Sequence, residues 1–96
     1  MRAEIRELIL DSLTAVDMLA AATAIVNEIT PEDAKGASVV AKALQAAREI
    51  LHYAEQLRNA DNAQWQASFQ FELNNSTSTL KKQAKRILFQ EKRSAS

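Results

Sequence analysis

The sequence predicts an all-α fold. The chain of 96 residues has one glycine and one proline, too few for the tight turns of a β-sandwich. Alanine, leucine, glutamine, glutamate and lysine, which favour helices, are abundant. Apolar residues recur every three to four positions in two long stretches, which is the helical period. We therefore expect a bundle-like single domain, residues 1–96: a long antiparallel helical hairpin, about 3–29 and 31–59, completed by one or two shorter C-terminal helices, about 62–73 and 79–93.

The first predicted helix has an apolar face and an acidic face, and would be about 40 Å long. The apolar face consists of Ile5, Leu8, Ile9, Leu13, Val16, Leu19, Ala20, Thr23 and Val26. Glu4, Glu7 and Asp11 lie roughly opposite, as a solvated face or as a docking patch for a basic partner. Met18 and Ile25 project away from the main apolar face, which predicts that a third element or a second copy of the chain covers them.

The second predicted helix has the clearest start signal in the chain. Thr30 can accept hydrogen bonds from free N–H groups of the first turn, and Pro31 has no N–H to leave unpaired. Gly36 falls in the second turn, where glycine costs up to ~1 kcal/mol relative to alanine, so the true start can move to Ala37. The short connection between the first two helices predicts that they pack as an antiparallel hairpin.

The segment that follows, residues 63–73, fits two structures. It alternates apolar and polar residues, which is the period of a half-buried strand, but Trp65, Phe69 and Leu73 are spaced by four, as on one face of a helix. We favour the helix, because the sequence offers no evident second strand. Residues 74–79 are rich in Asn, Ser and Thr, whose side chains compete for backbone hydrogen bonds, so a loop is predicted there.

The last predicted helix, residues 80–93, carries a basic face with Phe89 at its centre. Lys81 and Lys82 would sit at its N-terminal end, where the helix dipole disfavours cations, and a sequence that breaks a local rule is often functional there. Such a face can meet an acidic protein surface, bind nucleic acid through phosphates and stacking, or lie on an anionic membrane. The candidate partner-binding residues are Lys81, Lys82, Lys85, Arg86, Phe89, Lys92, Arg93, Trp65 and Phe71.

The net charge of zero conceals a division along the chain. Residues 1–80 hold six basic and eleven acidic residues, a net charge of −5, and residues 81–96 hold six basic and one acidic residue, a net charge of +5. Asymmetry of this kind between segments can mark an interaction surface.

Residue types that carry chemistry are few. The chain has no cysteine, and its single histidine, His52, lies with polar residues on the second predicted helix. No spacing of ligands suits a metal, and neither a glycine-rich phosphate loop nor a nucleophile elbow is present. We therefore expect a non-enzymatic protein without cofactor or metal. The apolar runs are too short to span a membrane and the N-terminus does not read as a signal peptide, which predicts a cytoplasmic protein.

Together these observations predict a small helical protein-protein interaction module. It would act as an adaptor, inhibitor or chaperone by binding a larger protein or a second copy of itself in a homodimer. The alternative is a nucleic-acid-binding protein that uses the basic C-terminal helix, although dedicated nucleic-acid binders are usually basic across the whole domain. In length and helical content the chain resembles small bacterial and phage proteins, among them secretion co-chaperones, immunity proteins and phage-encoded inhibitors of host enzymes.

Overall fold

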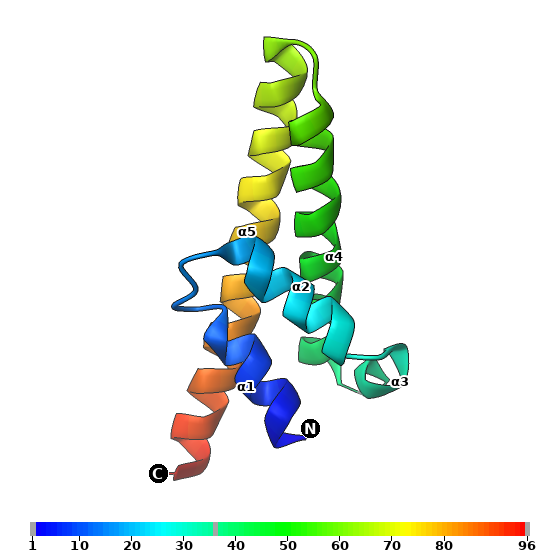
Figure 1. Cartoon of the computed structure of the whole chain (residues 1–96). Helices are drawn as coiled ribbons and strands as arrows, with labels where there is room; N and C mark the ends of the chain where they lie inside the picture. Colours follow the sequence, from blue (N-terminus) through cyan, green and yellow to red (C-terminus); the bar gives the residue numbers. More distant parts are fainter. Residues whose placement is uncertain (1, 36, 96) are drawn as a thin grey trace.

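The computed structural model describes residues 2–35 and 37–95, and this part of the chain contains helices and no strand (Figure 1). The predicted all-α, bundle-like class is confirmed, and so is the helical structure of the segment that alternates apolar and polar residues. The helices are α1 (Ala3–Asp11), α2 (Met18–Glu28), α3 (Pro31–Ala34), α4 (Ser38–Asn59) and α5 (Ala63–Ala95).

A long antiparallel hairpin dominates the molecule, but different helices form it from those predicted. α4 runs to the tip, and α5 returns alongside it, giving the molecule an extent of 51 × 26 × 21 Å (Figure 1). α1 and α2 lie across the half of this hairpin that is remote from the tip. The expected hairpin of one helix over 3–29 and another over 31–59 is therefore wrong in two respects. Each of these segments is divided into two helices, and α4 packs mainly against α5.

The predicted first helix is broken into α1 and α2, which run in opposite directions (Figure 1). The Ser12 hydroxyl is buried and donates a hydrogen bond of 2.6 Å to the carbonyl of Ile9, at the end of α1. Asp17 then caps α2, because its carboxylate accepts hydrogen bonds from the N–H groups of Leu19 and Ala20 at 3.0 and 3.3 Å. Val16, predicted on the apolar face, lies in the connecting loop with its side chain fully exposed.

The break explains the two apolar residues that did not fit the first predicted helix. Ile25 is completely buried, and Met18 is partly buried against the same core. Because the chain folds back before α2, α2 presents a different face to the core, and α4 packs against it. The chain's own third element thus covers these residues.

Thr30 and Pro31 begin a helix as predicted, but that helix is short. The Thr30 hydroxyl accepts a hydrogen bond of 3.2 Å from the N–H of Asp33, and the Asp33 carboxylate accepts one of 3.0 Å from the N–H of Thr30, which completes a capping box. α3 ends at Ala34, and α4 starts at Ser38 after its N-cap, Ala37. The interruption falls around Gly36, which itself lies outside the described residues.

α5 is continuous, so the predicted loop at 74–79 and the predicted division into helices 62–73 and 79–93 are both wrong. Ser76 is buried against α4, and its hydroxyl donates a hydrogen bond of 3.1 Å to the carboxylate of Glu49. Thr79 donates to the carbonyl of Asn75 within the helix, at 3.0 Å. Ser76 and Thr79, two of the residues that were expected to interrupt the helix, instead have hydrogen-bond partners in the folded chain.

The hydrophobic core lies where α1 and α2 cross the hairpin. It draws on α1, α2, α4 and α5 and on the residue that follows α2. Its buried apolar members are Ile5, Ile9, Ala22, Ile25, Ile29, Val39, Val40, Ala43, Leu44, Ala46, Ala47, Ile50, Leu80, Ala84 and Ile87. This half of the molecule is therefore the rigid base on which the surface groups described below are mounted.

Candidate partner-binding site

The C-terminal half of α5 has one buried side and one basic side. Leu80, Ala84 and Ile87 are buried in the core. At 100° per residue, Lys82 and Phe89 fall on the side of the helix opposite these three residues and project away from the core. The predicted apolar and basic faces of this segment are thus separated as the sequence indicated.

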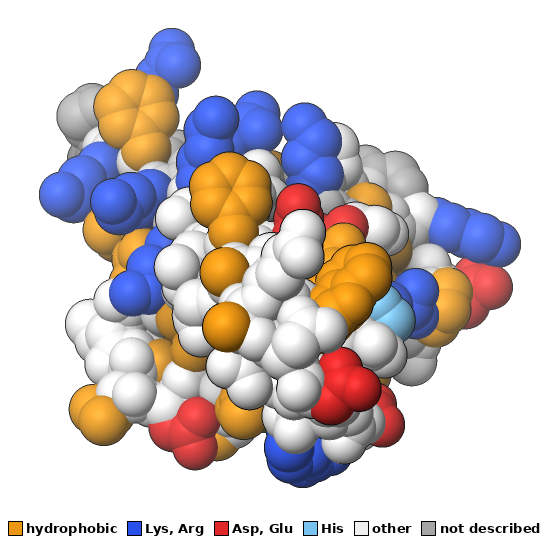
Figure 2. Space-filling model, turned by 90° about the horizontal axis from the view of Figure 1, so that it is seen from above, with side chains coloured by type: hydrophobic (Ala, Val, Ile, Leu, Met, Phe, Trp, Pro, Cys, Tyr) orange, Lys and Arg blue, Asp and Glu red, His pale blue; other side chains and the backbone are white. Residues whose placement is uncertain are grey.

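A shallow groove of about 420 Å³ runs over this outward side, and we call it the basic groove. It is lined by Lys82, Lys85, Arg86, Phe89, Gln90 and Arg93. The Phe89 side chain is 61% exposed, and the guanidinium carbon of Arg93 lies 5.9 Å from the centre of its ring. Seen from above, Lys and Arg side chains gather along one side of the molecule with a hydrophobic side chain among them (Figure 2).

Every residue that lines the basic groove is exposed, so the groove cannot enclose a small molecule. Small-molecule sites usually bury most of the surface of their ligand. A ring left in water among cations is instead suited to a flat macromolecular surface, where the aromatic group supplies buried area and the cations supply long-range attraction.

The other predicted binding residues lie outside this groove. Lys81 is partly buried at the side of α5, and Lys92 is exposed beside the groove. Phe71 is 63% exposed on the same side of the helix as Phe89, but five turns away, about 27 Å at 1.5 Å per residue. Trp65 lies near the tip, where its ring stacks on that of Phe69 with centroids 5.7 Å apart. The structure therefore brings five of the nine candidates together: Lys82, Lys85, Arg86, Phe89 and Arg93.

Lys81 and Lys82 do not lie at a helix N-terminus, because α5 begins at Ala63. The dipole of α5 therefore does not act against either lysine. Lys82 still lines the basic groove, whereas Lys81 lies outside it and loses the reason for which it was singled out.

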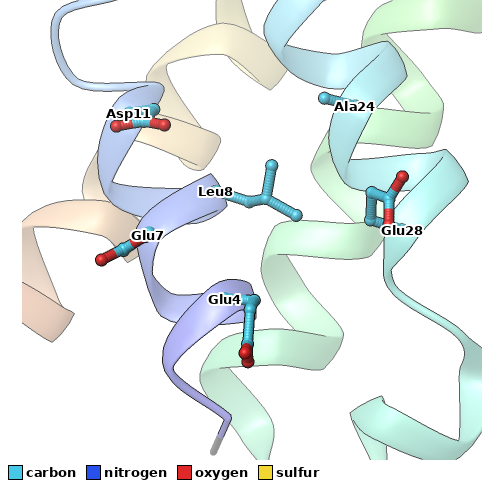
Figure 3. Close-up of a pocket in the computed structure, with 6 residues that line it drawn as sticks. All are labelled: Glu4, Glu7, Leu8, Asp11, Ala24 and Glu28. Carbon is cyan, nitrogen blue, oxygen red and sulfur yellow. The ribbon is translucent and has the colours of Figure 1, made fainter.

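A second groove, of about 380 Å³, lies between α1 and α2 and is acidic. It is lined by Glu4, Glu7, Leu8, Asp11, Ala24 and Glu28, and we call it the acidic groove. In Figure 3, Leu8 points from α1 toward α2, whereas Glu7 points away from α2, and Asp11 and Glu28 lie toward opposite ends of the groove. The sequence identified the acidic stripe on α1 but missed Glu28. Only the reversal of direction between the two helices brings Glu28 to this groove.

The described residues contain no group of three His, Cys, Asp or Glu side chains placed to hold a metal ion. His52 is exposed, and its ring meets that of Tyr53 edge to face at 5.1 Å. None of the described helices combines the length and the apolar character that crossing a membrane requires.

The chain was compared with models of protein families, with curated proteins and with solved structures, and none of them matches it.

Proposed function

We propose that this chain is a non-catalytic protein-interaction module whose basic groove binds an acidic surface of a protein partner. The observation that carries the proposal is Phe89, which is 61% exposed at the centre of four cationic side chains on a well-packed helix. In the free chain most of this ring stays in water, whereas an interface would gain from burying it, since binding energy concentrates in aromatic and arginine anchors.

The geometry supports a preorganised site. The opposite side of α5 is fixed in the core by Leu80, Ala84 and Ile87, so the helix loses little freedom when a partner binds. Lys82 and Lys85 have no ion pair within the described residues and are available to a carboxylate of the partner. The cations would raise the association rate and make it dependent on salt, while Phe89 would supply buried area.

The test compares two triple variants that carry the same net charge. The first variant replaces three residues of the basic groove by glutamine: Lys82, Lys85 and Arg86. The second replaces three exposed residues of α4 by glutamine: Lys42, Arg48 and Arg58. Each purified chain is immobilised and used to capture proteins from a lysate of its native host. We expect the amount of captured protein to fall at least tenfold with the first variant and to stay unchanged with the second. Equal capture by both variants, or no capture by the unsubstituted chain, would contradict the proposal.

Nucleic acid is the second candidate ligand, because an exposed ring among cations also suits base stacking beside phosphates. Nucleic-acid binding predicts a different experimental result from protein binding. Fluorescence anisotropy with single- and double-stranded oligonucleotides should show affinity that falls linearly with the logarithm of salt concentration and that is lost in the Lys82, Lys85 and Arg86 variant. Absence of binding at low salt would remove this candidate. The net charge of −5 over residues 1–80 weighs against it, since that part of the chain repels phosphates.

A further inference from the structure

The basic groove and the acidic groove are similar in size and opposite in charge. The basic groove presents Lys82, Lys85, Arg86 and Arg93, and the acidic groove presents Glu4, Glu7, Asp11 and Glu28. Each also has an apolar group at its centre, Phe89 in the first and Leu8 in the second. The surface that the basic groove is proposed to bind is therefore present on the molecule itself.

Most of the charges that line the two grooves take no part in the ion pairs given for the described residues. Among the described residues, ion pairs join Arg2 to Asp33, Arg6 to Glu91 and Lys35 to Glu32, at 3.0, 2.7 and 3.2 Å. No carboxylate of the acidic groove takes part in them, and neither do Lys82, Lys85 and Arg86. Both grooves thus present charge that a partner can neutralise.

The acidic groove also places two carboxylates where the backbone disfavours them. Asp11 is the last residue of α1 and Glu28 is the last residue of α2. The C-terminal end of a helix carries partial negative charge, so an acidic side chain there is typically destabilising by about 0.3–1 kcal/mol. The described contacts of the chain supply no cation to either residue. Two unfavourable placements, one toward each end of the acidic groove, favour cations supplied from outside the chain.

We infer that the partner of the basic groove is a second copy of this chain, which offers its acidic groove. This inference rests on the proposed function, because it assigns the acidic protein surface bound by α5. Phe89 of one copy would lie against Leu8 and Ala24 of the next, with Lys82 and Lys85 beside the carboxylates. The two patches differ, so a contact that uses one groove of each copy is heterologous and leaves the other two grooves open to further copies. Association then either continues beyond the dimer or closes, as a reciprocal two-fold dimer or as a ring.

The experiment uses two double variants that each disable one groove. Lys82→Gln/Lys85→Gln removes charge from the basic groove, and Asp11→Asn/Glu28→Gln removes it from the acidic groove. The second variant removes carboxylate charge from the C-terminal ends of two helices, so its melting temperature should be unchanged or higher. Its melting temperature therefore shows whether the variant is folded. Molar mass is measured by sedimentation velocity on nuclease-treated protein, over a concentration series at low salt and at about 1 M salt, where the Debye length is ~3 Å.

We expect the unsubstituted chain to increase in mass with concentration at low salt and to become monomeric at high salt. Each variant alone should associate at least tenfold more weakly. A mixture of the two should form a 1:1 dimer that does not grow, because each variant supplies the groove that the other lacks.

Three results would overturn the inference: a monomeric unsubstituted chain at every concentration, variants that associate as strongly as the unsubstituted chain, or a mixture that remains monomeric. Failure here is distinct from failure of the proposed function. If the chain is monomeric but still captures another protein through Lys82, Lys85 and Arg86, only the self-association is wrong. If it captures nothing either, both are wrong.

Discussion

The two halves of the α4–α5 hairpin consist of the same two helices but differ in what covers them. In the half crossed by α1 and α2, seven residues of α4 between Val39 and Ile50 are buried. Toward the tip no further helix lies on the pair, and no residue from 51 to 75 is buried (Figure 1). A single helix-helix contact cannot remove its side chains from water on more than one side. Trp65 and Phe71 remain exposed for that reason.

This difference separates a rigid region from a weakly held one. Local stability follows buried apolar contact, so the tip should open more readily than the covered half. Both charged grooves belong to the covered half, where the helices that carry them are fixed by the core. The basic groove thus has the preorganisation that favours affinity, whereas Trp65 near the tip lacks it. We therefore base the proposed function on Phe89 rather than on the equally exposed aromatic residues farther up the hairpin.

The largest expected effect contrasts one leucine from each half. Leu80→Ala removes a completely buried side chain and should lower the free energy of unfolding by about 2–5 kcal/mol. Leu57→Ala removes a partly buried side chain of the uncovered half and should cost only about 1 kcal/mol. Urea denaturation of the two variants measures the difference. Equal losses would show that the tip is as tightly packed as the base and would remove the distinction between the halves.

A smaller effect is expected at the border between the halves. The Ser76 hydroxyl is buried and bonds to Glu49 across the hairpin, so Ser76→Ala should cost about 1 kcal/mol. Ser78→Ala is the matched control, because Ser78 is exposed on the other side of α5 and should change stability by less than about 0.5 kcal/mol. Thermal unfolding followed by circular dichroism compares them. If the two variants melt together, the hydrogen bond does not help to hold the hairpin.

The smallest effect concerns the cap of α3, which belongs to the covered half. Hydrogen bonds from the backbone N–H and the hydroxyl of Thr30, with the charge of Arg2, hold the pKa of Asp33 below its usual value of 3.8. A lowered pKa in the folded state contributes stability above pH 3.8, and this contribution is lost as the pH falls through the folded-state pKa. Asp33→Asn should therefore be less stable than the unsubstituted chain at neutral pH.

That difference should narrow as the pH falls below 3.8. Thermal melts of both proteins over the acid range measure it. A gap between the two melting temperatures that stays constant from neutral pH to strong acid would show that the ionised carboxylate of Asp33 adds nothing to the cap.

Some features of the molecule depend on neighbours in the sequence, and these could be predicted. The helical period, the N-cap at Thr30 and the position of Phe89 opposite Leu80 each involve residues within about one to three turns of one another. The basic groove could be predicted for the same reason, because Lys82, Lys85, Arg86, Phe89 and Arg93 lie on one helix. No contact between distant segments is needed to bring them together.

Other features depend on contacts between distant segments, and the sequence patterns did not reveal them. The apolar pattern over residues 5–26 suits one long helix, but folding back at Ser12 lets both Ile9 and Ile25 enter the same core. The residues at 74–79 are poor helix formers by only a few tenths of a kcal/mol each. Packing against α4 and the bond from Ser76 to Glu49 outweigh that preference, so α5 continues.

The sequence by itself determined the helical class, the start of α3 and the basic face of α5, because each follows from local spacing along a helix. Tertiary structure alone decided which helices form the hairpin, where the first helix breaks and that Glu28 joins the acidic groove. Those outcomes depend on which arrangement buries the most apolar surface, a quantity that belongs to the whole chain and not to any one segment.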